Sequence, residues 1–385
     1  MADTYDCIVI GSGPGGYVAA IRAAQLGMTT AVIERDDVVG GRCLNYACIP
    51  AKAVLRSADI LSEVRDAGEF GISLNGTEPT VDFGAISERR KKVITTLTGG
   101  VAGLFKKNGI ELISGEASLT ADGDVKVGDT VYTATKAVIL ATGSVKRPLP
   151  NLDFGGNVIG TEEAWALPEL PSTMVVIGAG ASGTEIASAY QRLGTQVTLY
   201  EGLDRVLPTE DADISKAAAR GFKKQGIDVK VGTFYDPAAQ EADWVVIAAG
   251  RGPDVEGLGL DAAGIELTEH GLIKVDGALR TSRPKVYAIG DLVPGPALAT
   301  KNVMLGDCGA CCANAAPPRL SVAKDAANDT VMIRCMVSPL FPFSSGRPEC
   351  ERSEVALVRS SALAVRMPGA GGRQQNIRLA RPQAG

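Results

Sequence analysis

The sequence predicts an α/β fold made of two nucleotide-binding domains, each built on a doubly wound parallel sheet. An apolar run, a glycine-rich turn, a helical segment and a second apolar run occur in this order twice, beginning near residues 5 and 174. This order is the opening unit of a doubly wound α/β domain. Later apolar runs that stop at glycine supply further strands to both sheets. Two such units imply two bound nucleotides.

Apolar periodicity places the individual elements. The stretch between the two units reads as a helix followed by an inserted β-meander, which is broken at Asp122-Gly123-Asp124. The expected elements, in chain order, are a strand over 5–10, a helix over 14–26, a strand over 29–33, a helix over 82–107, short strands within 110–140 that end in a strand over 137–140, a strand over 174–177, a helix over 182–192, a strand over 196–200, a late strand of the second sheet over 243–249 and a late strand of the first sheet over 285–289.

The first glycine-rich turn is Gly11-Ser12-Gly13-Pro14-Gly15-Gly16. In this pattern Gly11 makes the tight turn, Gly13 lets the backbone approach a pyrophosphate, and Gly16 allows close packing of the helix. The helix N-terminus adds amide donors and a positive dipole end. Glu34 ends the next strand, where its carboxylate is placed to bind ribose hydroxyls. A glycine triplet alone is weak evidence, but here the strand, the helix and the acid all follow in order.

The second turn, Gly178-Ala179-Gly180-Ala181-Ser182-Gly183, repeats this spacing, with Gly178, Gly180 and Gly183 in the three glycine positions. Glu201 again follows 23 residues after the first glycine. A carboxylate there favours a ribose 2′-hydroxyl and repels a 2′-phosphate, and the next arginine is Arg205. The second unit is therefore expected to be a Rossmann-like domain for NAD rather than NADP.

Cys43 and Cys48 lie in the segment Gly40-Gly41-Arg42-Cys43-Leu44-Asn45-Tyr46-Ala47-Cys48-Ile49-Pro50-Ala51-Lys52. A disulfide between them closes a very short loop, so it would remove little entropy from the unfolded chain and stabilise the fold poorly. A redox role explains the pair better. The alternative, a metal site, needs a second pair of ligands, and nothing nearby in the sequence supplies one.

Composition sets the class of protein. The formal net charge is −5, from 39 basic and 44 acidic residues, without a long basic run, so a nucleic-acid partner is not expected. No apolar stretch approaches the roughly 20 residues that cross a bilayer, and no signal sequence is recognisable, so we expect a soluble cytoplasmic protein without a membrane partner. In that compartment a cysteine pair is more often catalytic or metal-binding than structural.

Several segments together resemble the pyridine-nucleotide disulfide oxidoreductases, and among these the dihydrolipoamide dehydrogenases. The resemblance covers residues 1–300. Its motifs are the cysteine segment, both glycine turns, Ala141-Thr142-Gly143, Ala249-Gly250-Arg251, Tyr287-Ala288-Ile289-Gly290-Asp291, Glu201-Gly202-Leu203-Asp204-Arg205-Val206-Leu207-Pro208 and Gly295-Pro296-Ala297-Leu298-Ala299.

The resemblance implies two cofactors and an order of electron transfer. FAD is implied in residues 1–150 and 276–300, and NAD in residues 151–275. Electrons would pass from a dithiol or lipoyl-domain substrate to the Cys43–Cys48 disulfide, then to FAD and NAD, with Cys43 exchanging with the substrate and Cys48 facing the flavin. The remaining implied contacts are Gly41, Lys52, Ala117, Thr142, Gly143, Asp291 and Ala299 to FAD and Gly250 to NAD.

Lys52 and Glu185 are the other implied catalytic residues. Lys52 lies four residues after Cys48, so a helix that begins at Cys48 would carry both on one face. Its ammonium could then favour negative charge on the flavin or the thiolate. The alternative is a solvated helix lysine. Glu185 would pair with Lys52 by the resemblance, although a glutamate in a helix first turn is also favoured by the helix dipole alone.

Two features depart from the family pattern. The segment 232–242 is shorter than the strand meander the family carries there, which predicts a smaller NAD-domain sheet. Family members are homodimers whose last domain supplies a His–Glu base, whereas Thr300 stands where histidine is usual and the dimer domain is not recognisable. The single histidine, His270, is expected to be a solvated loop residue. Loss of a positioned base costs about 10²- to 10⁴-fold in rate.

Residues 301–385 differ in composition from the rest. They carry 11 Lys and Arg against 6 Asp and Glu, and five of the eight cysteines. We expect an irregular, disordered tail. Cys308-Gly309-Ala310-Cys311-Cys312 could instead form a zinc cluster or a vicinal thiol pair, but no histidine accompanies it and no metal site is predicted. The alternative functions are an FAD-binding protein with little turnover, and a related reductase for mercuric ion or another disulfide.

Overall fold

The structure is a computed structural model that describes residues 3–299, 301, 302 and 306. The chain divides into two compact units, Met1–Ala323 and Lys324–Gly385, and every described residue belongs to the first. Apart from Lys301, Asn302 and Gly306, the predicted tail lies outside the described residues, as do Thr300 and the Cys308–Cys312 cluster.

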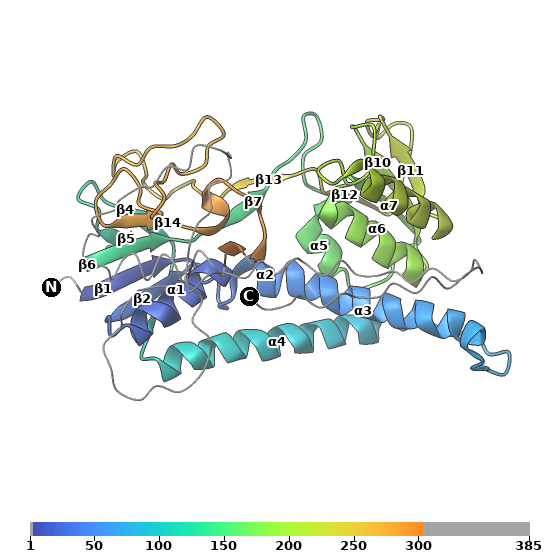
Figure 1. The fold of residues 1–385 in the computed structure, drawn as a ribbon, viewed down its shortest axis with the longest axis horizontal. Coiled ribbons are helices and arrows are strands. Elements are labelled where there is room, and N and C mark those ends of the chain that lie inside the picture. Colours follow the sequence, from blue (N-terminus) through green and yellow to red (C-terminus); the bar gives the residue numbers. More distant parts are fainter. Residues whose placement is uncertain (1–2, 300, 303–305, 307–385) are drawn as a thin grey trace, which may run out of the picture. The chain divides into compact units, whose positions relative to one another are not determined.

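The first sheet has seven strands in the order β3-β2-β1-β6-β5-β4, with β14 beside β6 (Figure 1). Strands β1, β2, β3, β6 and β14 run parallel, and β4 and β5 form an antiparallel meander on β6. The second half of β1 is almost completely buried, as are the last four residues of β6. The bounds are β1 Asp3–Ile10, β2 Thr30–Glu34, β3 Glu111–Ser114, β4 Ala117–Leu119, β5 Val125–Val127, β6 Thr130–Leu140 and β14 Val286–Ala288.

The first predicted unit is confirmed, with element ends shifted by one or two residues, and α1 (Pro14–Gln25) is its helix. The meander differs from the prediction at one strand. Residues 137–140 are the end of an 11-residue strand, β6. The periodicity missed its first half because residues 130–132 pair with β5 in a partly exposed hairpin, whereas residues 137–140 are buried in the parallel part of the sheet.

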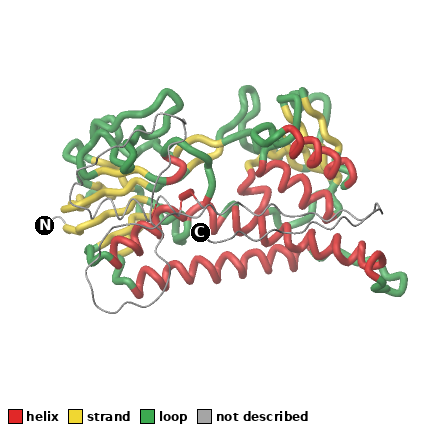
Figure 2. Tube along the Cα trace, in the orientation of Figure 1, coloured by secondary structure: helices red, strands yellow, loops and turns green. Residues whose placement is uncertain are grey.

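Two long helices follow the first unit. The short α2 (Gly41–Asn45) precedes α3 (Cys48–Arg65), and the 3₁₀ helix η1 (Asp66–Phe70) follows α3 directly. The predicted helix over 82–107 is confirmed as α4 (Phe83–Lys107), which Asp82 caps by accepting a hydrogen bond from Ala85 N. Figures 1 and 2 show α3 and α4 running side by side, and α3 also packs against α6 of the second unit.

The second sheet has five parallel strands in the order β11-β10-β9-β12-β8. One face packs against the helices of this unit and against α3, and their shared core contains Trp165, Met174, Ile186 and Tyr190. The second predicted unit and the strand at 243–249 are confirmed within three residues. The bounds are β8 Val158–Gly160, α5 Thr161–Ala166, β9 Thr173–Ile177, α6 Ala181–Leu193, β10 Gln196–Glu201, α7 Ala212–Lys224, β11 Asp228–Val231 and β12 Trp244–Ile247.

The connection between β11 and β12 contains no strand, and part of it packs against the other face of the second sheet. Tyr235 and Ala242 contact a cluster that includes Val175 and Tyr200. The Gln240 side chain accepts a hydrogen bond from Tyr200 Oη (2.7 Å) and donates one to Thr198 Oγ1 (2.8 Å). A short loop therefore helps to cover this face. It stands in the place of a strand meander, as the shortness of segment 232–242 predicted.

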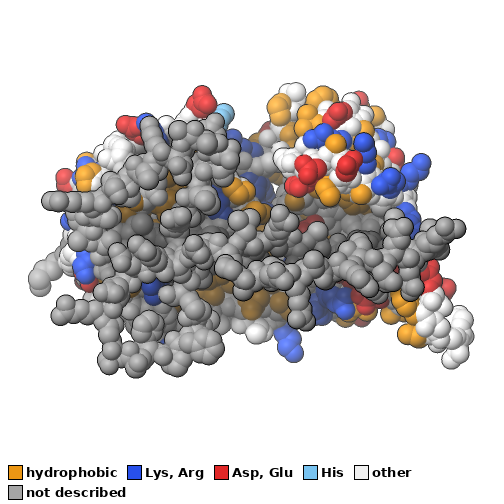
Figure 3. Space-filling view, in the orientation of Figure 1, with side chains coloured by type: hydrophobic (Ala, Val, Ile, Leu, Met, Phe, Trp, Pro, Cys, Tyr) orange, Lys and Arg blue, Asp and Glu red, His pale blue; other side chains and the backbone are white. Residues whose placement is uncertain are grey.

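A two-stranded antiparallel ribbon connects the two sheets, formed by β7 (Ser144–Lys146) and β13 (Arg251–Pro253). The 3₁₀ turn η2 (Gly290–Leu292) follows β14. None of the helices in the described part of the chain has the length and apolarity needed to span a bilayer. Around α7, acidic and basic side chains are interspersed on the surface (Figure 3).

Candidate functional site

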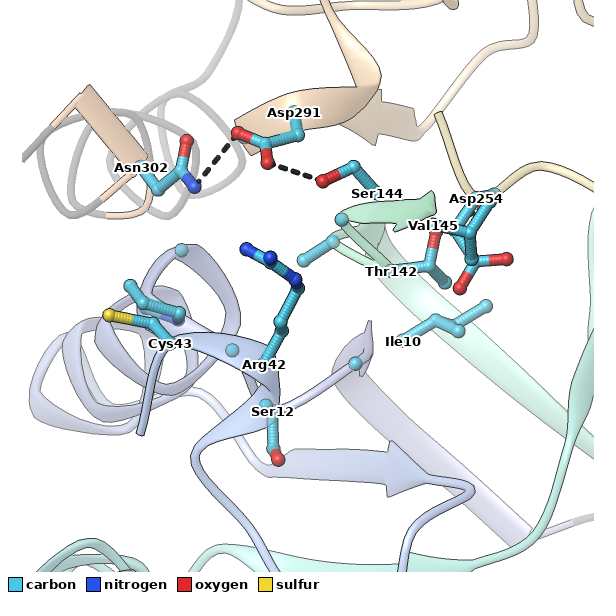
Figure 4. Close-up of a pocket in the computed structure, with 18 of the residues that line it drawn as sticks. Ile10, Ser12, Arg42, Cys43, Thr142, Ser144, Val145, Asp254, Asp291 and Asn302 are labelled. Atoms are coloured by element: carbon cyan, nitrogen blue, oxygen red, sulfur yellow. Dashed lines mark hydrogen bonds between the residues drawn. The ribbon is translucent and has the colours of Figure 1, made fainter. Parts of the chain in front are cut away.

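A cavity of about 610 Å³ opens at the carboxyl ends of β1 and β2 (Figure 4). The first glycine turn, the cysteine segment, the β7–β13 ribbon and the residues after β14 all contribute to its lining. Ligand pockets of about 300–1,000 Å³ accept molecules of drug or cofactor size. The predicted site residues among its lining are Gly11, Gly13, Glu34, Gly41, Cys43, Cys48, Ala117, Thr142, Gly143, Asp291 and Ala299.

The first glycine turn has no room for a side chain at Gly11 or Gly16, two of the three positions where the prediction requires glycine. Gly11 has φ of +99°, and a Cβ on Gly16 would lie 1.9 Å from the Gly11 carbonyl oxygen. A Cβ on Gly41 would also clash with this turn, since it would lie 2.6 Å from Gly13 Cα. Nothing lies within 4 Å of a Cβ on Gly13, which leaves that backbone open toward the cavity. Backbone amides at the start of α1 can therefore face an anion.

Glu34 is buried at the end of β2 and supports this turn. Its Oε2 accepts hydrogen bonds from Ser12 N (2.8 Å) and Ser12 Oγ (2.5 Å), and its Oε1 accepts one from Asp36 N (3.0 Å). Thr142 Oγ1 donates to the Asp254 carbonyl (2.6 Å), which holds the segment after β6 against the cavity wall.

The second glycine turn has the same geometry. Gly178 has φ of +103°, and a Cβ on Gly183 would lie 1.9 Å from the Gly178 carbonyl oxygen. Glu201 accepts hydrogen bonds from Ala179 N (2.8 Å) and Leu203 N (3.0 Å). Gly250, with φ of +137°, follows β12 in the chain. These residues surround the carboxyl edge of the second sheet, apart from the 610 Å³ cavity.

Cys43 lies in α2, and Cys48 begins α3. Both are free thiols in this structure and both line the cavity. A hydrogen bond between the two thiols lowers the pKa of Cys48 to about 7, against the opposing effect of burial, with further help from the positive charges of Arg42 and Lys52. The same hydrogen bond, together with burial, raises the pKa of Cys43. The two sulfurs therefore differ in protonation, which suits a pair in which one thiol exchanges and the other rests as a thiolate.

The structure pairs Lys52 with Glu185, with 2.6 Å between Nζ and Oε1. Lys52 comes from α3, and Glu185 is the fifth residue of α6, one position beyond its first turn. Seven residues further along the same two helices, Asp59 and Arg192 form a second ion pair, with 2.6 Å between Oδ1 and Nη1. Lys52 does not line the cavity, and its side chain is 61% exposed.

A polar network that no sequence motif indicated lies on the cavity wall. Arg42 Nε lies 2.6 Å from Glu162 Oε1, and Arg251 Nη1 lies 2.9 Å from the same oxygen. Ser144 Oγ accepts from Arg251 Nε (3.1 Å) and donates to Asp291 Oδ2 (2.7 Å). Arg42 and Arg251 stood inside recognised motifs, but nothing in the sequence indicated that Glu162 joins them.

The residues present fit an FAD molecule. The cavity has a suitable volume, and its glycine turn is open at Gly13. Asn302 also lines the cavity, and its buried Oδ1 has no hydrogen-bond partner among the described residues. Figure 4 shows Asn302 and Asp291 hydrogen-bonded to each other at one side of the cavity (3.2 Å). A buried acceptor of this kind indicates a polar ligand group.

The predicted loop position of His270 is confirmed. Its side chain is 78% exposed and lies 3.5 Å from Glu269, and it is not among the residues that line the cavity. In the described part of the chain, no three His, Cys, Asp or Glu side chains are grouped closely enough to hold a metal ion.

Comparison with known proteins gives a consistent result. Residues 5–306 match the pyridine nucleotide-disulphide oxidoreductase family. Dihydrolipoyl dehydrogenase of Geobacillus stearothermophilus is 39% identical over 317 residues, which are 77% of this chain and 67% of that protein. Leghemoglobin reductase of Glycine max is 38% identical over 326 residues, covering 78% and 62%. The HOCl-induced flavoprotein disulfide reductase RclA of Escherichia coli has a similar fold, with a TM-score of 0.68 and 26% identity over 79% of this chain and 69% of that one.

The order of strands, the two glycine turns and the cysteine pair agree with these similarities over the same part of the chain. The chain therefore belongs to the pyridine nucleotide-disulphide oxidoreductase family and is an FAD- and NAD-dependent disulfide oxidoreductase.

Proposed function

We propose that this chain exchanges electrons between a dithiol substrate of the dihydrolipoyl type and NAD, using Cys43 and Cys48 as its redox pair. The observation that carries the proposal is the opposed pKa of the two thiols in one cavity with the first glycine turn. We also propose that the cavity holds FAD and that the second glycine turn and Glu201 hold NAD. The relatives named dihydrolipoyl dehydrogenase indicate the substrate class.

The exchange proceeds in two steps at the cysteine pair. A substrate thiolate attacks the Cys43 sulfur of the disulfide, and Cys48 leaves as a thiolate, which its pKa of about 7 favours. The second substrate thiol then attacks the mixed disulfide at the substrate sulfur and expels Cys43, which takes up a proton because its pKa is raised. The substrate dithiol becomes a disulfide, and the protein disulfide becomes a dithiol. Bound FAD supplies the two-electron chemistry that connects this dithiol with NAD.

The reaction should be asymmetric in direction. Oxidation of a dithiol needs a base that deprotonates the substrate thiol, and His270, the single histidine of the chain, is exposed and does not line the cavity. A positioned base contributes about 10²- to 10⁴-fold. Transfer from NADH toward the disulfide requires no such base, so we expect it to proceed while oxidation of dihydrolipoamide is slow.

An anaerobic titration tests the proposal. Purified full-length protein with bound flavin is titrated with NADH, and the long-wavelength absorbance of a thiolate beside oxidised flavin is recorded. We expect the band in the wild type, and we expect Cys48→Ser to abolish it. Absence of the band in flavin-loaded wild type refutes the redox role of the pair. Turnover is then measured with lipoamide, with mercuric ion and with another disulfide as the substrate. The substrate that is turned over identifies the reductase, and little turnover with all three indicates an FAD-binding protein.

A further inference from the structure

Arg42 precedes Cys43 in the chain and projects into the same cavity (Figure 4). Its side chain is 28% exposed, and two hydrogen bonds hold it there: Nε to Glu162 Oε1 (2.6 Å) and Nη2 to Thr161 Oγ1 (3.1 Å). Both partners belong to the first turn of α5, which is more than 110 residues away in the sequence. The guanidinium is therefore held in place by a different part of the chain from the one that carries the thiols.

Arg42, Arg251 and Glu162 are not balanced in charge among themselves. Arg42 and Arg251 contact the same oxygen of Glu162, so these three side chains carry one net positive charge. A second carboxylate, Asp291, is joined to Arg251 through Ser144 Oγ. No hydrogen bond or ion pair among the described residues joins Asp291 to Arg42. Arg251 is fixed further by Ser144 of the β7–β13 ribbon. All three ionic side chains are largely buried, with exposures between 21% and 28%, so solvent screens the excess charge less than it would at an open surface.

We propose that Arg42 is a positioning residue of the redox pair: anchored by Glu162, it holds a positive charge next to Cys43 and Cys48 and thereby favours the thiolate form of Cys48. This inference rests on the proposed function in one respect, which is that Cys43 and Cys48 are the redox pair. The charged state of Cys48 itself is a property of the folded chain and exists without cofactor.

Within the described part of the chain, the other titratable groups that interact with Cys48 come from three elements. Lys52 lies on its own helix, Cys43 lies on α2, and Tyr17 lies on α1, where burial and the two cysteines raise its pKa. Lys52 is 61% exposed and is already paired with Glu185, so its field is more strongly screened than that of Arg42. The hydrogen bond from Cys43 lowers the pKa of Cys48 most. Of the two positive charges, Arg42 lowers this pKa more than Lys52 does.

The consequence for the reaction follows from leaving-group chemistry. A sulfur with a lower thiol pKa leaves faster in thiol–disulfide exchange. Arg42 makes no bond to the substrate in this account. It acts through Cys48, and its removal should slow the first exchange step, in which Cys48 departs.

The test measures the thiolate directly. Reduced full-length protein is alkylated with iodoacetamide over a range of pH, and modification of Cys48 is quantified from fragment ions of its peptide. We expect a midpoint of about 7 in the wild type. Arg42→Met and Arg42→Gln should raise the midpoint by about one unit, which corresponds to roughly tenfold less thiolate well below the midpoint. Arg42→Lys should retain much of the wild-type midpoint.

Arg56→Met is the matched control, because Arg56 lies on α3 eight residues after Cys48, is half-exposed and pairs with Glu63. Its midpoint should equal that of the wild type. Arg42→Gln keeps a hydrogen-bond donor for Glu162, so it tests the charge should Arg42→Met fail to fold. An unchanged midpoint in a folded Arg42→Gln overturns the proposal, and so does a loss of FAD affinity without a change of midpoint. Alkylation needs neither FAD nor NAD, so its outcome is independent of the NADH titration.

Discussion

The two glycine turns have nearly the same geometry, yet they stand in very different surroundings. In each, the first glycine has a positive φ near 100°, and a Cβ on the third would lie 1.9 Å from the carbonyl oxygen of the first. In each, a buried glutamate accepts a backbone amide of the turn at 2.8 Å and a second amide two residues beyond itself at 3.0 Å. The motif therefore builds one and the same anion-binding backbone twice.

The differences lie outside the motif. The first turn borders a cavity that the cysteine segment, the ribbon and the residues after β14 complete. The second turn stands beside Gly202, against which the ring of Phe234 packs while remaining 85% exposed. Thr233 N donates to the Glu201 carbonyl (3.0 Å), which fixes this loop next to the predicted ribose-binding carboxylate. The comparison teaches that the turn provides nucleotide binding, while the neighbouring segments decide what chemistry accompanies it.

The largest expected effect separates the two turns. Gly16→Ala and Gly183→Ala each force a methyl group into a carbonyl oxygen at 1.9 Å, a clash that should cost about 3 kcal/mol and weaken binding about 100-fold. Gly16→Ala should yield protein without flavin. Gly183→Ala should keep its flavin and lose affinity for NADH. Flavin absorbance and fluorescence titration with NADH measure the two outcomes.

Gly13→Ala and Gly180→Ala are the controls, because nothing lies within 4 Å of either Cβ and both residues have negative φ. Their thermal unfolding temperature should equal that of the wild type, with only nucleotide affinity reduced. If Gly183→Ala lost flavin and Gly16→Ala lost NADH, the assignment of the two turns would be reversed.

A smaller effect distinguishes the two buried glutamates. Glu34 accepts three hydrogen bonds, including one from Ser12 Oγ, whereas Glu201 accepts two, because Ala179 occupies the equivalent position. Hydrogen bonds to charged groups contribute about 1.5–3 kcal/mol each. Glu34→Gln should therefore lower the free energy of unfolding by about 2–4 kcal/mol, and Glu201→Gln by roughly 1 kcal/mol less. Urea denaturation monitored by circular dichroism measures the difference, and equal losses would contradict this account.

The smallest effect concerns the link between the two halves. Lys52 and Glu185 are 61% and 39% exposed, so Lys52→Met should change the free energy of unfolding by at most about 1 kcal/mol. The effect should shrink further in high salt. Asp59→Asn, which breaks the neighbouring link to Arg192, is the matched comparison. A loss of several kcal/mol in Lys52→Met would show that the pair is structural rather than a modest electrostatic contact.

By itself, the sequence determined the features that depend on local pattern. The two glycine turns, the acids that end the following strands and the helical spacing over 82–107 were all predictable, because each needs a particular residue type at a fixed spacing along the chain. The cysteine pair and the position of Lys52 after Cys48 belong here too, since their relation is fixed within one short segment.

The tertiary structure alone decided the contacts between distant segments. Glu162 meets Arg42 and Arg251 from 120 and 89 residues away, and no periodicity or motif links these positions. The first part of β6 escaped prediction for a different reason, because none of residues 130–136 is buried. Contacts between distant segments have no local signal in the sequence, so only the folded chain could show that Arg42 and Arg251 share the Glu162 carboxylate.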